Sequence, residues 1–128
     1  MKINLQVSNR YLFAFIFLFL LSCNPASILE GFDSQQWKAD EDGCNNQRME
    51  LIDEIISRKA ELQGLSQNEI TGVLGKADRH ELYSRNKKAF VYFVSGGPNC
   101  ENKKENPEKL VIRFDGIGRA KEIILYKN

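Results

Sequence analysis

The chain has 128 residues, of which 18 are basic and 17 acidic, so its formal net charge is +1. This near-neutral balance argues against a nucleic-acid partner, because phosphate binding needs a clustered excess of cations. With one histidine, His80, the composition offers no multi-histidine metal site, and this residue is expected to be a polar position at a strand edge. The length suits one domain with a modest core.

The first 22 residues have the pattern of a secretory signal peptide. Lys2 and Arg10 precede an unbroken apolar run, residues 11–21, which is too short to cross a bilayer as a helix. The alternative is a short membrane anchor that is kept in the mature chain. Removal of residues 1–22 leaves 16 basic and 17 acidic residues, a net charge near −1.

The segment Leu20-Leu21-Ser22-Cys23 resembles the bacterial lipobox, in which an invariant cysteine becomes the first residue of a lipoprotein. The resemblance implies that Cys23 carries a diacylglycerol and an acylated amine, and is the protein's contact with the membrane. Several acyl chains suffice for a stable anchor, whereas one gives only marginal binding. Asn24 replaces the aspartate that retains lipoproteins in the inner membrane, which favours the outer membrane and a periplasm-facing domain.

Cys44 and Cys100 are the pair that remains once Cys23 is lipidated. In an oxidising envelope compartment such a pair favours a disulfide. The alternative, redox-active thiols, usually has a close C-x-x-C spacing that this sequence lacks.

The mature chain divides into a lipidated tether, residues 23–31, and a single domain, residues 32–128. The acidic run Asp40-Glu41-Asp42-Gly43 is expected to be a solvated turn. A calcium loop is the alternative, but its glycine belongs at the sixth position, not the fourth.

Two amphipathic helices are predicted at the start of the domain. Apolar residues recur at steps of three and four from Asn46 to Leu62, with Arg48 among the residues placed on the wet face. A second, shorter helix begins at the capping-box residues Ser66 and Glu69 and stops at Gly75.

Beyond Asp78 the apolar period becomes two, which predicts strands over 80–85, 89–94, 109–114 and 120–126. Short connections between consecutive strands imply an antiparallel sheet. The predicted fold is therefore α+β, with two N-terminal helices on one face of a three- to four-stranded antiparallel sheet. A long polar loop separates the second and third of the four strands.

The segment GLSQNEITGVLGKAD and the strands that follow resemble the outer-membrane lipoprotein family SmpA/OmlA, also called BamE. The residues that match its helix motif in type and spacing are Gly64, Leu65, Ser66, Ile70, Leu74 and Gly75, whereas Ala77 stands where the family usually has proline. The resemblance implies an α-α-β-β-β domain, similar also to the repeat of the β-lactamase inhibitor protein. Residues 32–56 look like a group of uncharacterised lipoproteins from Bacteroidetes-type bacteria.

The sequence favours a non-catalytic, lipid-anchored module that binds a protein partner in the envelope through its sheet or the 95–109 loop. Tyr92 and Tyr126 are candidate recognition residues, because tyrosine is enriched at interfaces. The alternatives are a small-ligand-binding protein or a hydrolase-like enzyme, but no nucleophile elbow, metal site or cofactor motif supports a particular chemistry.

Overall fold

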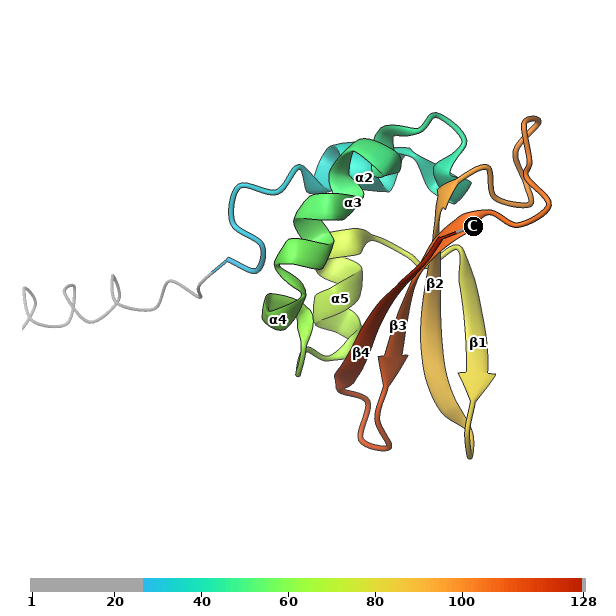
Figure 1. Cartoon of the computed structure of the whole chain (residues 1–128). Coiled ribbons are helices and arrows are strands. Elements are labelled where there is room, and N and C mark those ends of the chain that lie inside the picture. Colours follow the sequence, from blue (N-terminus) through green and yellow to red (C-terminus); the bar gives the residue numbers. More distant parts are fainter. Residues whose placement is uncertain (1–26, 128) are drawn as a thin grey trace, which may run out of the picture.

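The computed structural model describes residues 27–127, which form a four-stranded sheet with helices along one of its faces (Figure 1). Cys23 and the next three residues of the expected tether lie outside the described residues. The tether was predicted to extend to residue 31, but Leu29 is buried against the helix-side core. The ordered domain therefore includes this residue.

Four α-helices precede the sheet in the described part of the chain. They are α2 (Ser34–Ala39), α3 (Gln47–Ser57), α4 (Lys59–Leu62) and α5 (Gln67–Leu74), with the short 3₁₀ helix η1 (Glu41–Gly43) between the first two. The prediction of two helices was therefore too low. The segment 32–44 contributes α2 and η1, and the long first helix is divided at Arg58, whose φ of −114° and ψ of 20° are not helical.

The helix α5 begins and ends where the sequence predicts. The Ser66 hydroxyl accepts a hydrogen bond from the Glu69 backbone N–H at 3.2 Å, which satisfies one of the free amides of the first turn. The helix ends at Gly75, whose φ of +77° is readily adopted by glycine.

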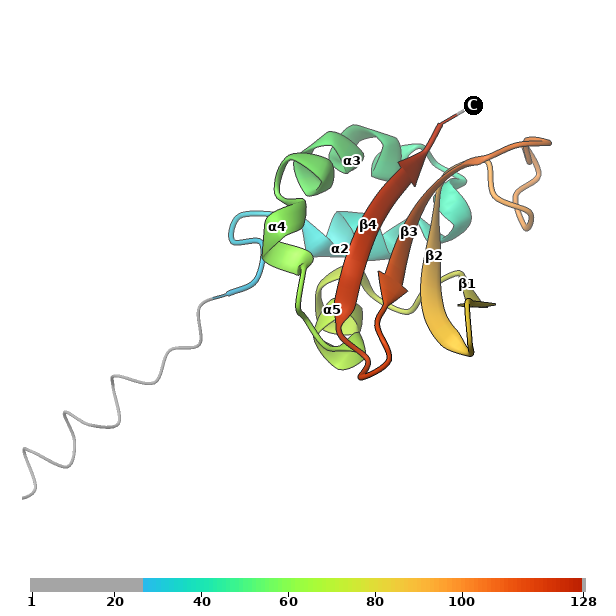
Figure 2. The same cartoon turned by 60° about the horizontal axis from the view of Figure 1, so that its bottom comes forward.

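All four strands pair with their sequence neighbours in an antiparallel sheet of order β1-β2-β3-β4. The strands are β1 (Arg79–Tyr83), β2 (Lys87–Ser95), β3 (Glu108–Phe114) and β4 (Ala120–Tyr126). The α+β class and the antiparallel sheet are confirmed, with four strands. Seen from below, the helices lie behind the sheet, and β4 forms one of its two edges (Figure 2).

The sheet has apolar residues buried on both faces. The side chains of Phe90, Tyr92 and Val94 join the main core beneath the helices, whereas Val91 and Phe93 join a smaller cluster on the opposite face. The elements described here place no helix over that second face. Long side chains border it instead: the Arg79 guanidinium carbon lies 5.2 Å from the Phe93 ring centre, and that of Arg113 lies 5.3 Å from the Tyr83 ring centre.

Candidate interaction surface

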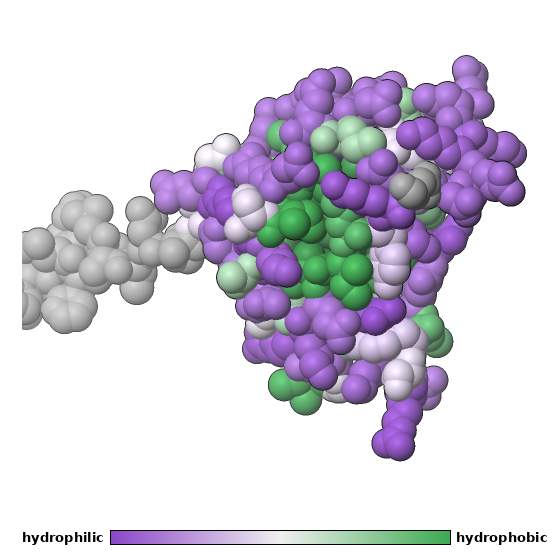
Figure 3. All heavy atoms as spheres, in the orientation of Figure 1, coloured by the Kyte–Doolittle hydropathy of each residue, from purple (hydrophilic) through white to green (hydrophobic). Residues whose placement is uncertain are grey.

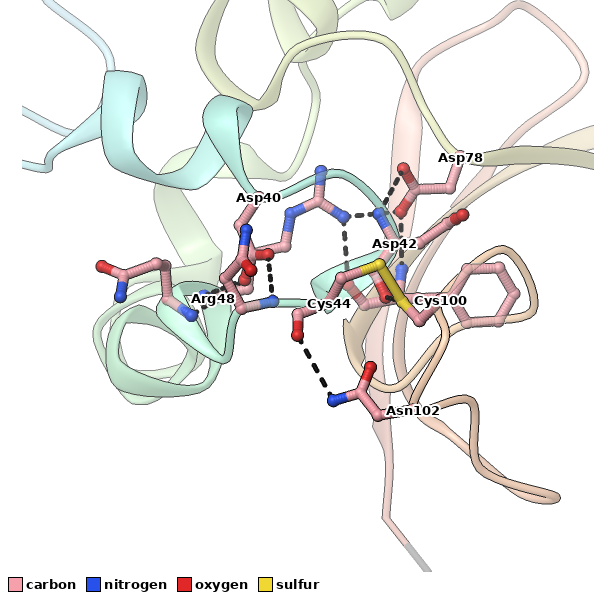
Figure 4. Close-up of a disulfide and its surroundings, with 10 residues drawn as sticks. Asp40, Asp42, Cys44, Arg48, Asp78, Cys100 and Asn102 are labelled. Atoms are coloured by element: carbon pink, nitrogen blue, oxygen red, sulfur yellow. Dashed lines mark hydrogen bonds and ion pairs between the residues drawn. A yellow bond between two sulfur atoms is a disulfide. The ribbon is translucent and has the colours of Figure 1, made fainter.

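The two cysteines that the sequence pairs are joined by a disulfide. Cys44 and Cys100 have Cα atoms 5.3 Å apart and are separated by 56 positions in the chain. The bond attaches the end of η1 to the loop between β2 and β3, and Figure 4 shows it beside a group of buried charged residues. The disulfide therefore links the helical half of the domain to the sheet.

Asp40 is buried and caps α3, so the expected solvated turn is wrong for this residue. Its carboxylate accepts backbone N–H groups from Asn45 at 2.7 Å, Gln47 at 2.8 Å and Arg48 at 3.1 Å (Figure 4). Anionic acceptors at this end of a helix also complement its dipole. Within residues 27–127, no group of three or more His, Cys, Asp or Glu side chains is placed to hold a metal ion.

Arg48 is also buried, although its position in the sequence suggested the wet face of α3. One guanidinium nitrogen donates to the Asp78 carboxylate at 2.5 Å and to the Phe93 carbonyl at 3.0 Å, and Nε donates to the Trp37 carbonyl at 3.0 Å. Helix α2, helix α3 and strand β2 are thereby held to the segment before β1. This charged centre is structural, because its side chains form hydrogen bonds with backbone groups of several elements, and Arg48 also pairs with Asp78.

The prediction that Tyr92 recognises a partner at the surface is wrong, because this residue is buried. Its side chain is fully buried beneath the helices, and its hydroxyl donates to the Gly75 carbonyl at 2.8 Å. Desolvation raises the pKa of this hydroxyl well above its ordinary value. In the sequence, Tyr92 alternates with Phe90 and Val94, which lie in the same core. This spacing was a signal for its burial.

Tyr126 lies on the surface, at the end of β4, and is 40% exposed. Its hydroxyl accepts a hydrogen bond from Arg113 at 3.2 Å, and the Lys109 ammonium lies 5.7 Å from its ring centre. Of the two tyrosines suggested by the sequence, this one is available to a partner. The structure separates them to opposite faces of the sheet, because Tyr92 points to the helices and Tyr126 away from them.

The strand β4 exposes an open hydrogen-bonding edge. Ala120 directs its backbone groups away from β3: its N–H donates to the Leu65 carbonyl and its carbonyl accepts from the Gly64 N–H, both at 2.8 Å. The side chains of Ile123 and Leu125 lie on the same face as Ala120, so their backbone groups point to the same side. Among the described residues, neither takes part in a backbone hydrogen bond outside the sheet.

An apolar surface adjoins this edge. In Figure 3 hydrophobic atoms gather in the centre of the face that carries β4, between that strand and the helices. The partly buried apolar residues at the border of the helix-side core are Ile28, Met49, Leu51, Ile56, Leu65 and Leu125. The last of these belongs to β4, so the open backbone edge and the apolar surface meet on one strand.

The opposite edge of the sheet is less suitable for strand addition. Strand β1 has five residues, and Arg79, His80 and Glu81 are charged or polar. Short, charged edge strands discourage pairing with other chains, whereas β4 has seven residues with an apolar centre. His80 is exposed, with its ring 4.7 Å from that of Phe90, which agrees with the expected polar position on a strand.

No family model matches this chain, and neither a curated protein nor a solved structure shows significant similarity to it. The resemblance to the SmpA/OmlA family stays a prediction from the sequence. None of the helices between residues 27 and 127 is long and apolar enough to cross a membrane.

Proposed function

We propose that this protein is an envelope lipoprotein whose domain binds an extended segment of a partner protein along the β4 edge. The single observation that carries the proposal is the open backbone edge at Ile123 and Leu125, next to apolar surface. In strand addition, main-chain hydrogen bonds supply affinity and alternate side chains supply specificity. We propose no catalytic role for this surface.

The partner segment inferred from this edge has a defined pattern. Residues of β4 alternate between the helix-side core, as Ile123 and Leu125 do, and the helix-free face, where Glu122 and Tyr126 lie. A paired strand has the same alternation. Its side chains beside Leu125 are therefore expected to be apolar, and those beside Glu122 and Tyr126 polar or aromatic.

The proposed location rests on the resemblance of the first 23 residues to a lipoprotein signal. We propose that Cys23 is lipidated and holds the domain at the outer membrane, facing the periplasm, as the lipobox resemblance implies. A disulfide between Cys44 and Cys100 agrees with such an oxidising compartment. The resemblance to SmpA/OmlA further suggests a role in an envelope assembly, which is part of this proposal.

Site-specific photo-crosslinking in living cells tests the interaction. A photoreactive residue at Lys121 or Tyr126 is expected to give a discrete adduct with one other protein. The matched position is Leu82, which is 69% exposed on the opposite edge of the sheet and is expected to give none. Equal adducts from both edges, adducts with a second copy of this chain alone, or none under several growth conditions count against the proposal.

The anchor has its own test. Radiolabelled palmitate is expected to be incorporated into the chain, and globomycin is expected to block its processing. The Cys23→Ala substitution should abolish labelling, whereas Cys44→Ala should leave it intact. Labelling that survives in the Cys23→Ala chain contradicts the proposed anchor.

A further inference from the structure

A second feature lies on the helix-free face of the sheet, and it includes Tyr126 at the end of β4. A half-open cleft of about 440 Å³ is formed where the ends of the four strands meet the loop between β2 and β3. Each strand contributes one lining residue: Arg79 from β1, Phe93 from β2, Lys109 from β3 and Tyr126 from β4. The volume is within the range of small-molecule sites, about 300–1,000 Å³.

The cleft is electropositive. Its lining holds three cationic side chains, Arg79, Lys104 and Lys109, against one carboxylate, Glu105, so its net charge is +2. Within the described residues, neither Lys104 nor Lys109 has a carboxylate within 4.0 Å. The only ion pair of the three cations there joins Arg79 to Glu81 at 3.7 Å, and both of these side chains are 40% exposed or more. An anion of charge near −2 therefore matches the cleft.

The same cleft has an apolar part. Phe93 and Tyr126 line it, and each of these rings already lies near a cation, Arg79 in the first case and Lys109 in the second. The Lys104 ammonium is held by the Ser95 hydroxyl at 3.0 Å, so this lysine is directed to the end of β2. The cations and the aromatic rings are thus arranged together, which suits a ligand with an anionic head and an apolar body.

We propose that this cleft binds a soluble phosphate monoester that carries an apolar or aromatic body. A phosphate monoester has a charge of about −1.5 to −2 at neutral pH and accepts charge-assisted hydrogen bonds from arginine and lysine. The same head group also occurs on lipids. The loop that borders the cleft lies on the opposite side of the domain from residue 27, where the described chain begins, which favours a soluble source (Figure 1).

Nuclear magnetic resonance of the full chain in a phosphate-free detergent tests this site, with phenyl phosphate as the probe. Saturable shifts are expected for the backbone amides of Phe93, Lys109 and Tyr126. Inorganic phosphate should bind more weakly because it lacks the ring, and phenol should produce no shift at these amides. Increasing salt should weaken binding, since the cations are partly exposed.

Substitutions distinguish binding in the cleft from a general attraction of the anion to positive charge on the surface. The double variant Lys104→Gln/Lys109→Gln is expected to weaken phenyl phosphate binding by roughly tenfold or more. The control is Lys88→Gln, an exposed lysine on β2 that does not line the cleft. It should bind as the unaltered chain does, and thermal melting should show that both variants stay folded.

Three results would overturn the proposal. The first is the lack of a saturable shift at phenyl phosphate concentrations up to roughly 1 mM. The second is an equal loss of binding in the Lys88→Gln control. The third is binding to phosphatidic acid vesicles without binding of phenyl phosphate, which would assign the cleft to a lipid head group. Because Lys121 does not line the cleft, photo-crosslinking from this position tests the β4 edge separately, and each site can fail independently of the other.

Discussion

Arg48 donates a hydrogen bond to Asp78 at 2.5 Å across 30 positions of the chain, and the two side chains are 1% and 5% exposed. Asp78 also accepts the Phe93 backbone N–H at 2.8 Å and that of Asp42 at 3.2 Å. The pair therefore joins α3, η1 and β2 at one buried point. A buried charge that loses its partner is costly, so this relationship predicts a strong effect of substitution.

Arg48→Met is expected to lower the free energy of unfolding by about 3–5 kcal/mol, because it leaves the Asp78 carboxylate buried without its cation. The fluorescence of Trp37, the single tryptophan, can follow unfolding in urea. The control is Arg119→Met, since Arg119 is 52% exposed and 3.9 Å from Glu69. Arg119→Met should lower the free energy of unfolding by less than about 1 kcal/mol. Equal costs for the two variants would show that the buried pair has no special role.

Removal of the disulfide should cost about 4 kcal/mol in the chain-entropy model, given the 56-position separation of its cysteines. Urea unfolding of the oxidised chain can be compared with that of the double variant Cys44→Ser/Cys100→Ser. An unchanged mass on reduction and alkylation, or an unchanged unfolding midpoint, contradicts a stabilising bond between these residues.

A substitution at Gly43 tests how closely η1 packs on β2. A Cβ atom added there would lie about 2.4 Å from the Val94 carbonyl carbon, and φ is +66°. Gly43→Ala is therefore expected to cost at least about 3 kcal/mol through overlap and backbone strain together. Gly64 has a φ of +86° and no atom within 4 Å of an added Cβ, so Gly64→Ala should cost only about 1–2 kcal/mol. Similar values for both glycines would contradict the close backbone contact.

Tyr92→Phe should cost about 1 kcal/mol at neutral pH, because it removes the hydrogen bond to the Gly75 carbonyl. Burial raises the pKa of Tyr92 above its ordinary value of 10.0, so the unfolded chain ionises first as pH rises. The stability that Tyr92 contributes is therefore complete below pH 10 and is lost as pH rises through the raised pKa.

The two chains should accordingly differ in their pH dependence. Unfolding midpoints measured from pH 7 to strongly alkaline pH are expected to fall more steeply for the unaltered chain than for Tyr92→Phe. Parallel curves would mean that this hydroxyl ionises equally in both states.

The sheet could be predicted because β2, β3 and β4 are rich in apolar residues and two of the three connections between strands are short. Leu110 and Ile112 alternate with Val111 along β3. As expected, the first two lie in the helix-side core and Val111 lies on the opposite face. The helix α5 could be predicted because its cap and its stop are local: Ser66 bonds to Glu69 three residues away, and Gly75 ends the helix. Such signals depend on neighbouring residues only.

The buried charges could not be predicted in the same way. Asp40, Arg48 and Asp78 satisfy one another or backbone groups across distances of up to 45 positions, so none of them has a local signature. The acidic run around Asp40 was predicted to be a solvated turn. The partners of Asp40 are backbone amides at the start of the next helix, which the sequence does not reveal. Asn46 is a favourable capping residue by type, but its φ of +59° and its lack of a capping hydrogen bond leave the cap to Asp40, and no local signal indicates this.

The most direct test of the account is whether the outward backbone N–H of β4 holds the partner. Leu125→Pro removes that N–H at the open edge, where proline is tolerated, and Leu125→Val keeps it. With the photoreactive residue at Lys121, strand addition at β4 predicts a lost adduct for Leu125→Pro and a retained one for Leu125→Val, with both chains folded. An adduct that persists in a folded Leu125→Pro chain would contradict binding by strand addition at β4.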